Sequence, residues 1–166
     1  MSLLAALNDS AFSAWIRESD SLFAYPGFIT LHTIGLALVV GLSAIVALLI
    51  LASAPAPTLA ATRPLFRAIW TGFAINALSG AVLVAADPLT MLFNPIMWAK
   101  FGFIFVAVGM LARLQRVVGR ADADAAVTVG MVPKLMAAAT LACWVGSIVT
   151  GRLTAYFGPV AGLLVN

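Results

Sequence analysis

Three polar side chains able to do chemistry interrupt the apolar stretches of this chain. His32 is the single histidine, Lys100 lies in a second apolar stretch, and Arg152 ends a third. A neutral imidazole in a dry pocket can ligate haem iron, and nearby cations can pair with the haem propionates. Imidazole with the thioether sulfurs of Met91 and Met97 suits Cu(I) instead. These residue types therefore predict a haem site or a copper site.

Each of the three also has an interpretation that needs no ligand. Lys100 and Arg152 lie near predicted helix ends, where long basic side chains can reach the lipid headgroups. His32 can donate a hydrogen bond to a neighbouring backbone carbonyl. Ionisable groups within membrane spans are nevertheless costly, and they usually face a bundle interior, a partner or a water-filled cavity. The hypothesis of a shared site therefore requires the three side chains to converge.

The composition predicts an integral membrane protein. Of the 166 residues, 63% are hydrophobic and 9% are charged, whereas soluble domains carry about half and about a quarter. This excludes a soluble enzyme, a disordered chain, a coiled coil and a disulfide scaffold. The nine Lys and Arg residues do not cluster among aromatic side chains, so nucleic-acid binding is excluded as well. Cys143 is the single cysteine, and we expect it to be a small buried hydrophobe.

Four long apolar runs predict four spanning helices in a single domain covering residues 1–166. About 20 helical residues cross a bilayer core, and helices satisfy their own backbone hydrogen bonds there. The predicted spans cover residues 27–54, 64–86, 95–114 and 133–152, after a short interfacial helix at residues 9–20. We therefore expect an all-α, up-down four-helix membrane bundle. The short connection from Asp87 to Asn94 should place the second and third spans side by side.

The distribution of positive charge predicts the orientation. Six basic residues lie on one side of the predicted bundle and three on the other; the six are Arg63, Arg67, Arg113, Arg116, Arg120 and Lys134, and the three are Arg17, Lys100 and Arg152. The side richer in Lys and Arg is normally cytoplasmic. We therefore expect a bacterial inner-membrane protein with both termini outside the cytoplasm. His32, Lys100 and Arg152 then share one outer depth, with Tyr156 one turn beyond Arg152 if that helix continues.

A stripe of small residues marks one face of the second span. Gly72, Asn76 and Gly80 are spaced by four residues. Such stripes let membrane helices approach closely, and Asn76 could then form a hydrogen bond to a neighbouring helix. The alternative is a smooth wall for a flat cofactor, in front of His32 and its one-turn neighbour Gly35.

Several of these segments, taken in order, resemble a known family. The segments are Tyr25-Pro26, His32-Thr-Ile-Gly35, Asn94-Pro95 followed by Lys100, and Gly151-Arg152 with Ala155-Tyr156-Phe157. Over about residues 12 to 157 they resemble a group of small four-helix bacterial inner-membrane proteins known as a domain of unknown function. The chain departs from that group after the first span, where Leu51-Ala-Ser-Ala-Pro55 replaces a segment that commonly carries Asp and Arg.

The pattern is also distantly similar to HemJ-type protoporphyrinogen oxidases and to the CopD-type copper-resistance membrane domain. In the HemJ type, a histidine of the first helix and a lysine at the start of a later helix are functional, and haem b is bound. The corresponding positions here are His32 and Lys100, although the flanking HemJ motifs are absent. The resemblance implies haem b binding, and protoporphyrinogen oxidation is a weaker implication.

Three functions therefore stay open. The first is a haem-b protein that transfers electrons near the outer face, with a quinone or a periplasmic redox protein as its partner. The second is a non-catalytic membrane subunit or anchor, bound to lipid, to another subunit or to a second copy of the chain. The third is copper handling. The predicted cofactor-binding residues are His32 (the iron ligand), Lys100, Arg152, Gly35, Asn76 and Tyr156, with Met97 or Met91 as a second metal ligand.

Overall fold

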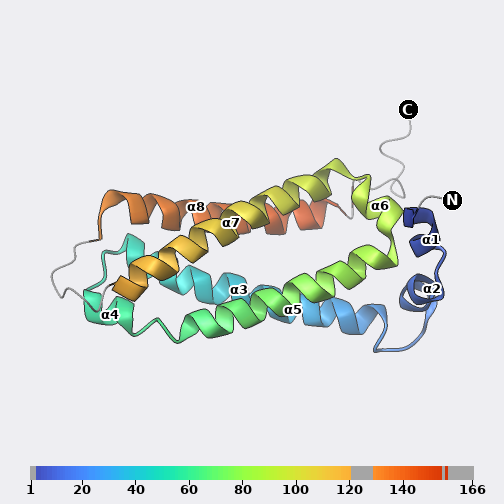
Figure 1. The fold of residues 1–166 in the computed structure, drawn as a ribbon, viewed down its shortest axis with the longest axis horizontal. Helices are drawn as coiled ribbons and strands as arrows, with labels where there is room; N and C mark the ends of the chain where they lie inside the picture. Colours follow the sequence, from blue (N-terminus) through green and yellow to red (C-terminus); the bar gives the residue numbers. More distant parts are fainter. Residues whose placement is uncertain (1–2, 121–128, 155, 157–166) are drawn as a thin grey trace.

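A computed structural model describes residues 3–120, 129–154 and 156, and this part of the chain is helical without strands. Within these described residues, four helices are long and apolar enough to cross a membrane: α3 (Tyr25–Leu51), α5 (Leu65–Ala86), α7 (Pro95–Arg120) and α8 (Met131–Leu153). They run up and down in succession (Figure 1). The expected all-α membrane bundle is confirmed.

The observed helix ends differ from the predicted ones for local reasons. The first span stops at Leu51 because Ser53 adopts the left-handed conformation, with φ of 55°. The N–H of Ala54 then donates to the carbonyl of Leu49, and that of Ser53 to Ile50. This is a Schellman motif, which ends helices by satisfying their last carbonyls. The third span instead continues beyond residue 114 to Arg120, a basic residue that suits a helix C-terminus.

Four short helices complete the described fold. The segment predicted to form a short helix at residues 9–20 contains α2 (Ala11–Glu18), and a break separates α2 from α1 (Leu3–Asn8), for which we made no prediction from the sequence. The break arises where the Ser10 hydroxyl accepts a hydrogen bond from the N–H of Ser13 and caps α2. The connections contain α4 (Ala56–Ala60) and α6 (Pro88–Leu92). We call the two ends of the bundle the α4 end and the α6 end; α1 and α2 lie at the α6 end (Figure 1).

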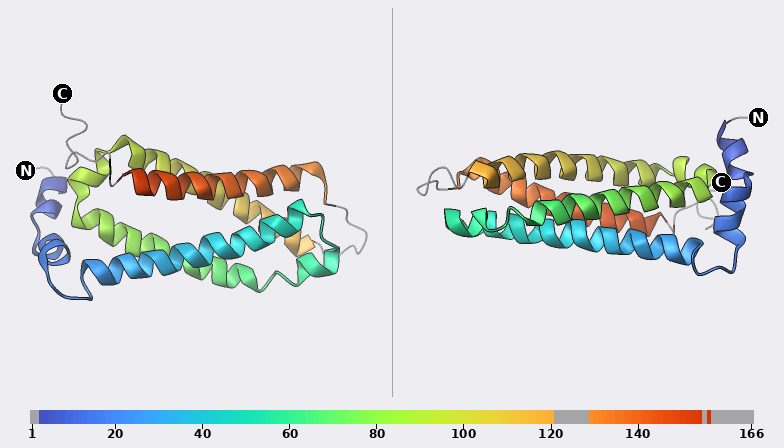
Figure 2. Two further views of the ribbon diagram at one scale, coloured as in Figure 1. Left: turned by 180° about the vertical axis from the view of Figure 1, so that it is seen from behind. Right: turned by 60° about the horizontal axis from the view of Figure 1, so that its bottom comes forward.

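The long helices form two layers. One layer pairs α3 with α5 and the other pairs α7 with α8, while α3 also contacts α8. The ribbon views in Figure 2 show the two pairs from two further directions. We predicted that the second and third spans lie side by side; α5 and α7 make little direct contact with each other. The short α6, which packs on both of them, lies in the connection between these two spans.

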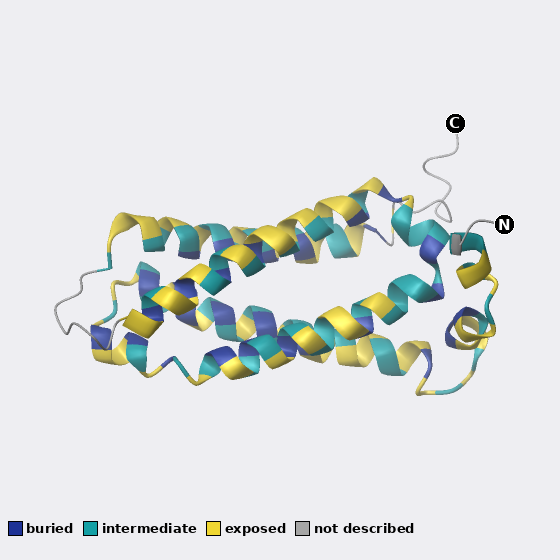
Figure 3. Cartoon of the chain, in the orientation of Figure 1, coloured by how far each residue is buried: buried dark blue, intermediate teal, exposed yellow. Residues whose placement is uncertain are grey.

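The apolar core is concentrated towards the α4 end. Its buried members from the four spans include Val46, Ala47, Ile50, Phe66, Ile69, Leu111, Leu114, Val118 and Ala137. A hydrogen bond of 2.9 Å from Trp70 Nε1 to Gln115 Oε1 also links α5 to α7 near this end. Burial colours in Figure 3 show the inward and outward faces of each span. The half of the bundle nearer the α6 end contributes little to this core, and that half contains the candidate site.

Candidate functional site

A close crossing of α3 and α5 positions His32. A Cβ added to Gly35 would lie 2.6 Å from the backbone nitrogen of Asn76 and 2.8 Å from the carbonyl oxygen of Gly72. Only residues without a Cβ allow this approach, so the packing interpretation of the small-residue stripe holds for Gly72. Gly35 is buried in the crossing and does not line the cavities described below.

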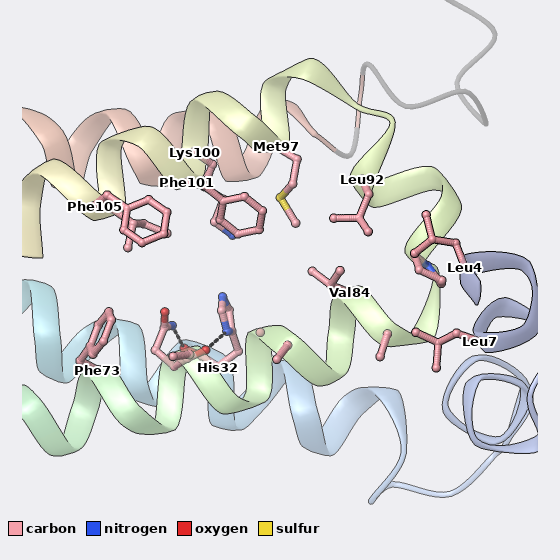
Figure 4. Close-up of a pocket in the computed structure, with 17 residues that line it drawn as sticks. Leu4, Leu7, His32, Phe73, Val84, Leu92, Met97, Lys100, Phe101 and Phe105 are labelled. Atoms are coloured by element: carbon pink, nitrogen blue, oxygen red, sulfur yellow. Dashed lines mark hydrogen bonds between the residues drawn. The ribbon is translucent and has the colours of Figure 1, made fainter. Parts of the chain in front are cut away.

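Two hydrogen bonds join His32 and Asn76 across this crossing. The Asn76 side-chain amide donates to the His32 carbonyl at 2.7 Å, and His32 Nδ1 lies 2.9 Å from the Asn76 carbonyl oxygen. A carbonyl oxygen can only accept, so Nδ1 carries the proton, and a neutral ring keeps its lone pair on Nε2. Metal-bound histidines commonly have this arrangement, in which the second ring nitrogen donates to a backbone carbonyl. Figure 4 shows the ring standing out from the α3–α5 layer.

Two further residues of α5 shape the surroundings of the imidazole. A Cβ added to Gly80 would lie 2.9 Å from His32 Cε1, so glycine leaves the space that the ring occupies. The Ser79 hydroxyl lies 3.3 Å from His32 Nδ1 and donates to the Ile75 carbonyl at 2.6 Å. Sequence reasoning missed Ser79. Its position three residues after Asn76, on the same side of the helix, was the available signal.

A slot between the two layers surrounds His32. It consists of two adjoining cavities of about 480 Å³ and about 390 Å³. Both are lined by His32, Asn76, Gly80, Val84, Met97, Lys100 and Ile104. His32 belongs to the α3–α5 layer, whereas Met97 and Lys100 extend from α7 on the opposite side (Figure 4). The slot is large enough for a small-molecule ligand.

The basic side chains lie on the α8 side of the slot. The Lys100 ammonium is 3.4 Å from where a Cβ on Gly151 would stand, so its side chain lies against α8. Arg152 is exposed at the end of α8 and lines the second cavity. No aspartate or glutamate is among the described residues that line either cavity. The structure thus brings His32, Lys100 and Arg152 to one slot, as the site hypothesis required.

The remaining predicted residues divide into two groups. Met97 is buried and lines both cavities, and the half-buried Met91 of α6 lines the second. Tyr156 does not line either cavity, because α8 ends at Leu153 and the tyrosine is 60% exposed. Tyr156, like Gly35, is therefore not in a position to contact a ligand in the slot.

The donor set of the slot is unusual for a free metal ion. The described residues contain no group of three His, Cys, Asp or Glu side chains that could hold a metal. A copper site would use His32 with the sulfurs of Met91 and Met97, close to two cationic side chains. Haem requires fewer protein ligands, because its porphyrin supplies four nitrogens to the iron. Its propionates would also complement Lys100 and Arg152, so the slot residues fit haem better than a bare cation.

Comparison of the chain with protein-family models, with curated proteins and with solved structures finds no match. The resemblance to small four-helix membrane proteins therefore stays a prediction. The functional argument rests on the geometry of the slot.

Proposed function

We propose that this protein binds haem b in the slot and transfers electrons near one face of the membrane. The observation that carries the proposal is the presentation of His32. Its Nδ1 is held by the Asn76 carbonyl, and its ring stands in a cavity whose described lining includes basic but not acidic side chains. Bound haem supplies one-electron chemistry, which no side chain of the slot provides.

Residues on the two walls of the slot suggest how the protein would hold haem. His32 on the α3–α5 layer would bind the iron. Met97 is the preferred second ligand, because it is buried and lines both cavities from the opposite layer. Lys100, which lies against Gly151, and Arg152 would pair with the propionates. Met91 is the other thioether available.

The distribution of basic residues supports an orientation in the membrane. Six Lys and Arg residues lie near the α4 end, and three lie nearer the α6 end. By the positive-inside rule, the α4 end faces the cytoplasm of a bacterial inner membrane. The slot then lies near the extracytoplasmic face, where a quinone or a periplasmic redox protein would exchange electrons with it.

Copper handling is the second candidate. Its supporting observation is that Met91 and Met97 line the same cavity as His32, which offers Cu(I) one imidazole and two thioethers. The charge of the slot weighs against copper, because Lys100 and Arg152 would repel a cation and no carboxylate among the described lining residues offsets them.

An absorption spectrum of detergent-purified protein, oxidised and then reduced with dithionite, tests the proposal. We expect a Soret band and sharpened visible bands on reduction, at about one haem per chain. The His32→Ala variant should lose them. The Met97→Ala variant should keep haem but shift to a five-coordinate spectrum, whereas Met110→Ala, whose methionine does not line either cavity, should change nothing.

Other outcomes select the alternatives. Full haem absorbance in His32→Ala contradicts the proposed ligand. A flat spectrum with haem supplied during expression, together with metal in protein from copper-fed cells, selects copper handling. Haem-free and metal-free protein that co-purifies with another chain in a fixed ratio selects a subunit role.

A further inference from the structure

One side of the slot opens between two spanning helices. Apart from His32, Asn76 and Lys100, every described residue that lines the first cavity is apolar or glycine. The α5 rim of this opening carries Ala77 and Ala81, both small and exposed. The α7 rim carries Phe105, which is 76% exposed. Exposed apolar residues on spanning helices face lipid, so we infer that this opening faces the bilayer.

The α6 end of the same cavity is covered by the N-terminal helices. Leu4 and Leu7 of α1 line that end of the cavity (Figure 4). The Ser13 hydroxyl of α2 lies 2.7 Å from both the Leu7 and the Ala85 carbonyl oxygens. An Arg17 guanidinium nitrogen donates to the Ala86 carbonyl at 2.6 Å. These contacts satisfy the last carbonyls of α5. They also hold α1 and α2 against the α6 end of the cavity, the end nearer to water.

Polar and apolar groups are divided across the slot. The cations Lys100 and Arg152 lie on the α8 side, whereas the α5–α7 opening is apolar. A ligand matched to this arrangement has anionic groups at one edge and an apolar body elsewhere. Such a ligand can enter with its anionic edge directed towards Lys100 and Arg152, while its apolar edge stays in the opening.

We propose that the slot exchanges its ligand with the bilayer through the α5–α7 opening, not with water at the α6 end. The ligand class is a planar anionic amphiphile dissolved in the membrane, and its identity as haem rests on the proposed function. The membrane is therefore the source from which the protein is loaded.

Haem transfer between liposomes tests the route. Apo-protein in liposomes is mixed with haem-loaded liposomes. The rate constants of haem association and dissociation are measured, together with the amount of haem bound at equilibrium. Ala81→Phe narrows the opening and should slow association by about tenfold, an added barrier of about 1.4 kcal/mol. Leu78→Phe is the matched control, because Leu78 is 71% exposed on the same helix and does not line either cavity. It should leave the rates unchanged.

The N-terminal helices provide the opposing variant. Ser13→Ala combined with Arg17→Gln removes the contacts that fasten α2 to α5. On the bilayer route this variant loads at the wild-type rate. If it loads about tenfold faster, and Ala81→Phe loads like the wild type, the ligand passes through the α6 end and the proposal is wrong.

A second measurement needs no haem. A nitroxide is attached through Ala81→Cys in a Cys143→Ala background, and its collisions with oxygen and with a polar nickel chelate are measured in liposomes. We expect high oxygen and low nickel accessibility, as at the control Leu78→Cys. Nickel accessibility well above that control would show water in the opening and overturn the route. Protein that takes up no haem but shows high oxygen and low nickel accessibility at residue 81 contradicts the proposed function. That result still supports an opening that faces lipid.

Discussion

Replacing Gly35 with alanine tests whether the α3–α5 crossing positions His32. The new Cβ would lie 2.6 Å from the Asn76 backbone nitrogen, and the next two closest atoms also belong to the α5 backbone. Backbone atoms cannot rotate away as a flexible side chain can. Restoring an ordinary contact of 3.4 Å therefore requires the two helices to separate by about 0.8 Å at this point.

The magnitude of the effect follows from the two hydrogen bonds that cross the same interface. Their lengths of 2.7 Å and 2.9 Å would rise to about 3.5 Å and about 3.7 Å, beyond the usual limit of about 3.2 Å. Overpacking costs about 1–3 kcal/mol, and an interhelical hydrogen bond in a membrane averages about 0.6 kcal/mol. We expect Gly35→Ala to lower the free energy of unfolding by roughly 2–4 kcal/mol.

The assay is equilibrium unfolding in mixed micelles with a rising fraction of dodecyl sulfate, followed by tryptophan fluorescence. Gly41→Ala, on the same helix, is the matched control. A Cβ added to Gly41 would meet no atom of a neighbouring element within 4 Å. This variant should be neutral or stabilising by up to about 1 kcal/mol, since alanine favours helix. Coincident unfolding curves for Gly35→Ala and Gly41→Ala would refute the reasoning, as would unchanged haem binding by Gly35→Ala.

Three further variants test other contacts. Gly80→Ala should push the imidazole from its place and weaken haem binding about tenfold, whereas Gly102→Ala, with open space around its Cβ, should not; titration of haem into apo-protein measures both. Ser13→Ala should cost about 1 kcal/mol and speed hydrogen exchange in the N-terminal helices, and unchanged protection would contradict this. Trp70→Phe removes the hydrogen bond to Gln115 and should lower the free energy of unfolding by about 0.5–1 kcal/mol in the same assay. Adding Gln115→Ala to this variant should lower it no further, because the bond is already lost.

The spanning helices were predictable because their signals extend over many residues. About 20 apolar residues suffice to identify each span, and Pro95 marks the first residue of α7 as observed. The short helices depend on single contacts instead. The Ser10 cap divides the N-terminal segment, and the Asp87 side chain caps α6 by accepting from the N–H of Thr90. Hydropathy over a long window does not contain that information.

The depth of the candidate site in the bundle was predictable from the sequence. Which residues of each helix point towards the site was not. Counting residues from each helix end placed His32, Lys100 and Arg152 at one level. The spacing of four placed Gly72 and Gly80 on one face of α5, yet the two glycines have different roles. At Gly72 the two helices are in close contact, whereas at Gly80 the imidazole of His32 occupies the space between them. The crossing point decides these roles, and it is a property of both helices together.

The α5–α7 opening changes which forces can hold a ligand. A pocket in a soluble protein is filled by water, and an apolar ligand gains free energy by leaving water. Here the ligand would leave lipid and displace acyl chains, so burying its apolar body contributes almost nothing. Affinity must then come from iron coordination and from the charge pairs with Lys100 and Arg152. The slot should therefore discriminate by metal and carboxylate, and a metal-free, esterified porphyrin should partition between slot and bilayer with little preference.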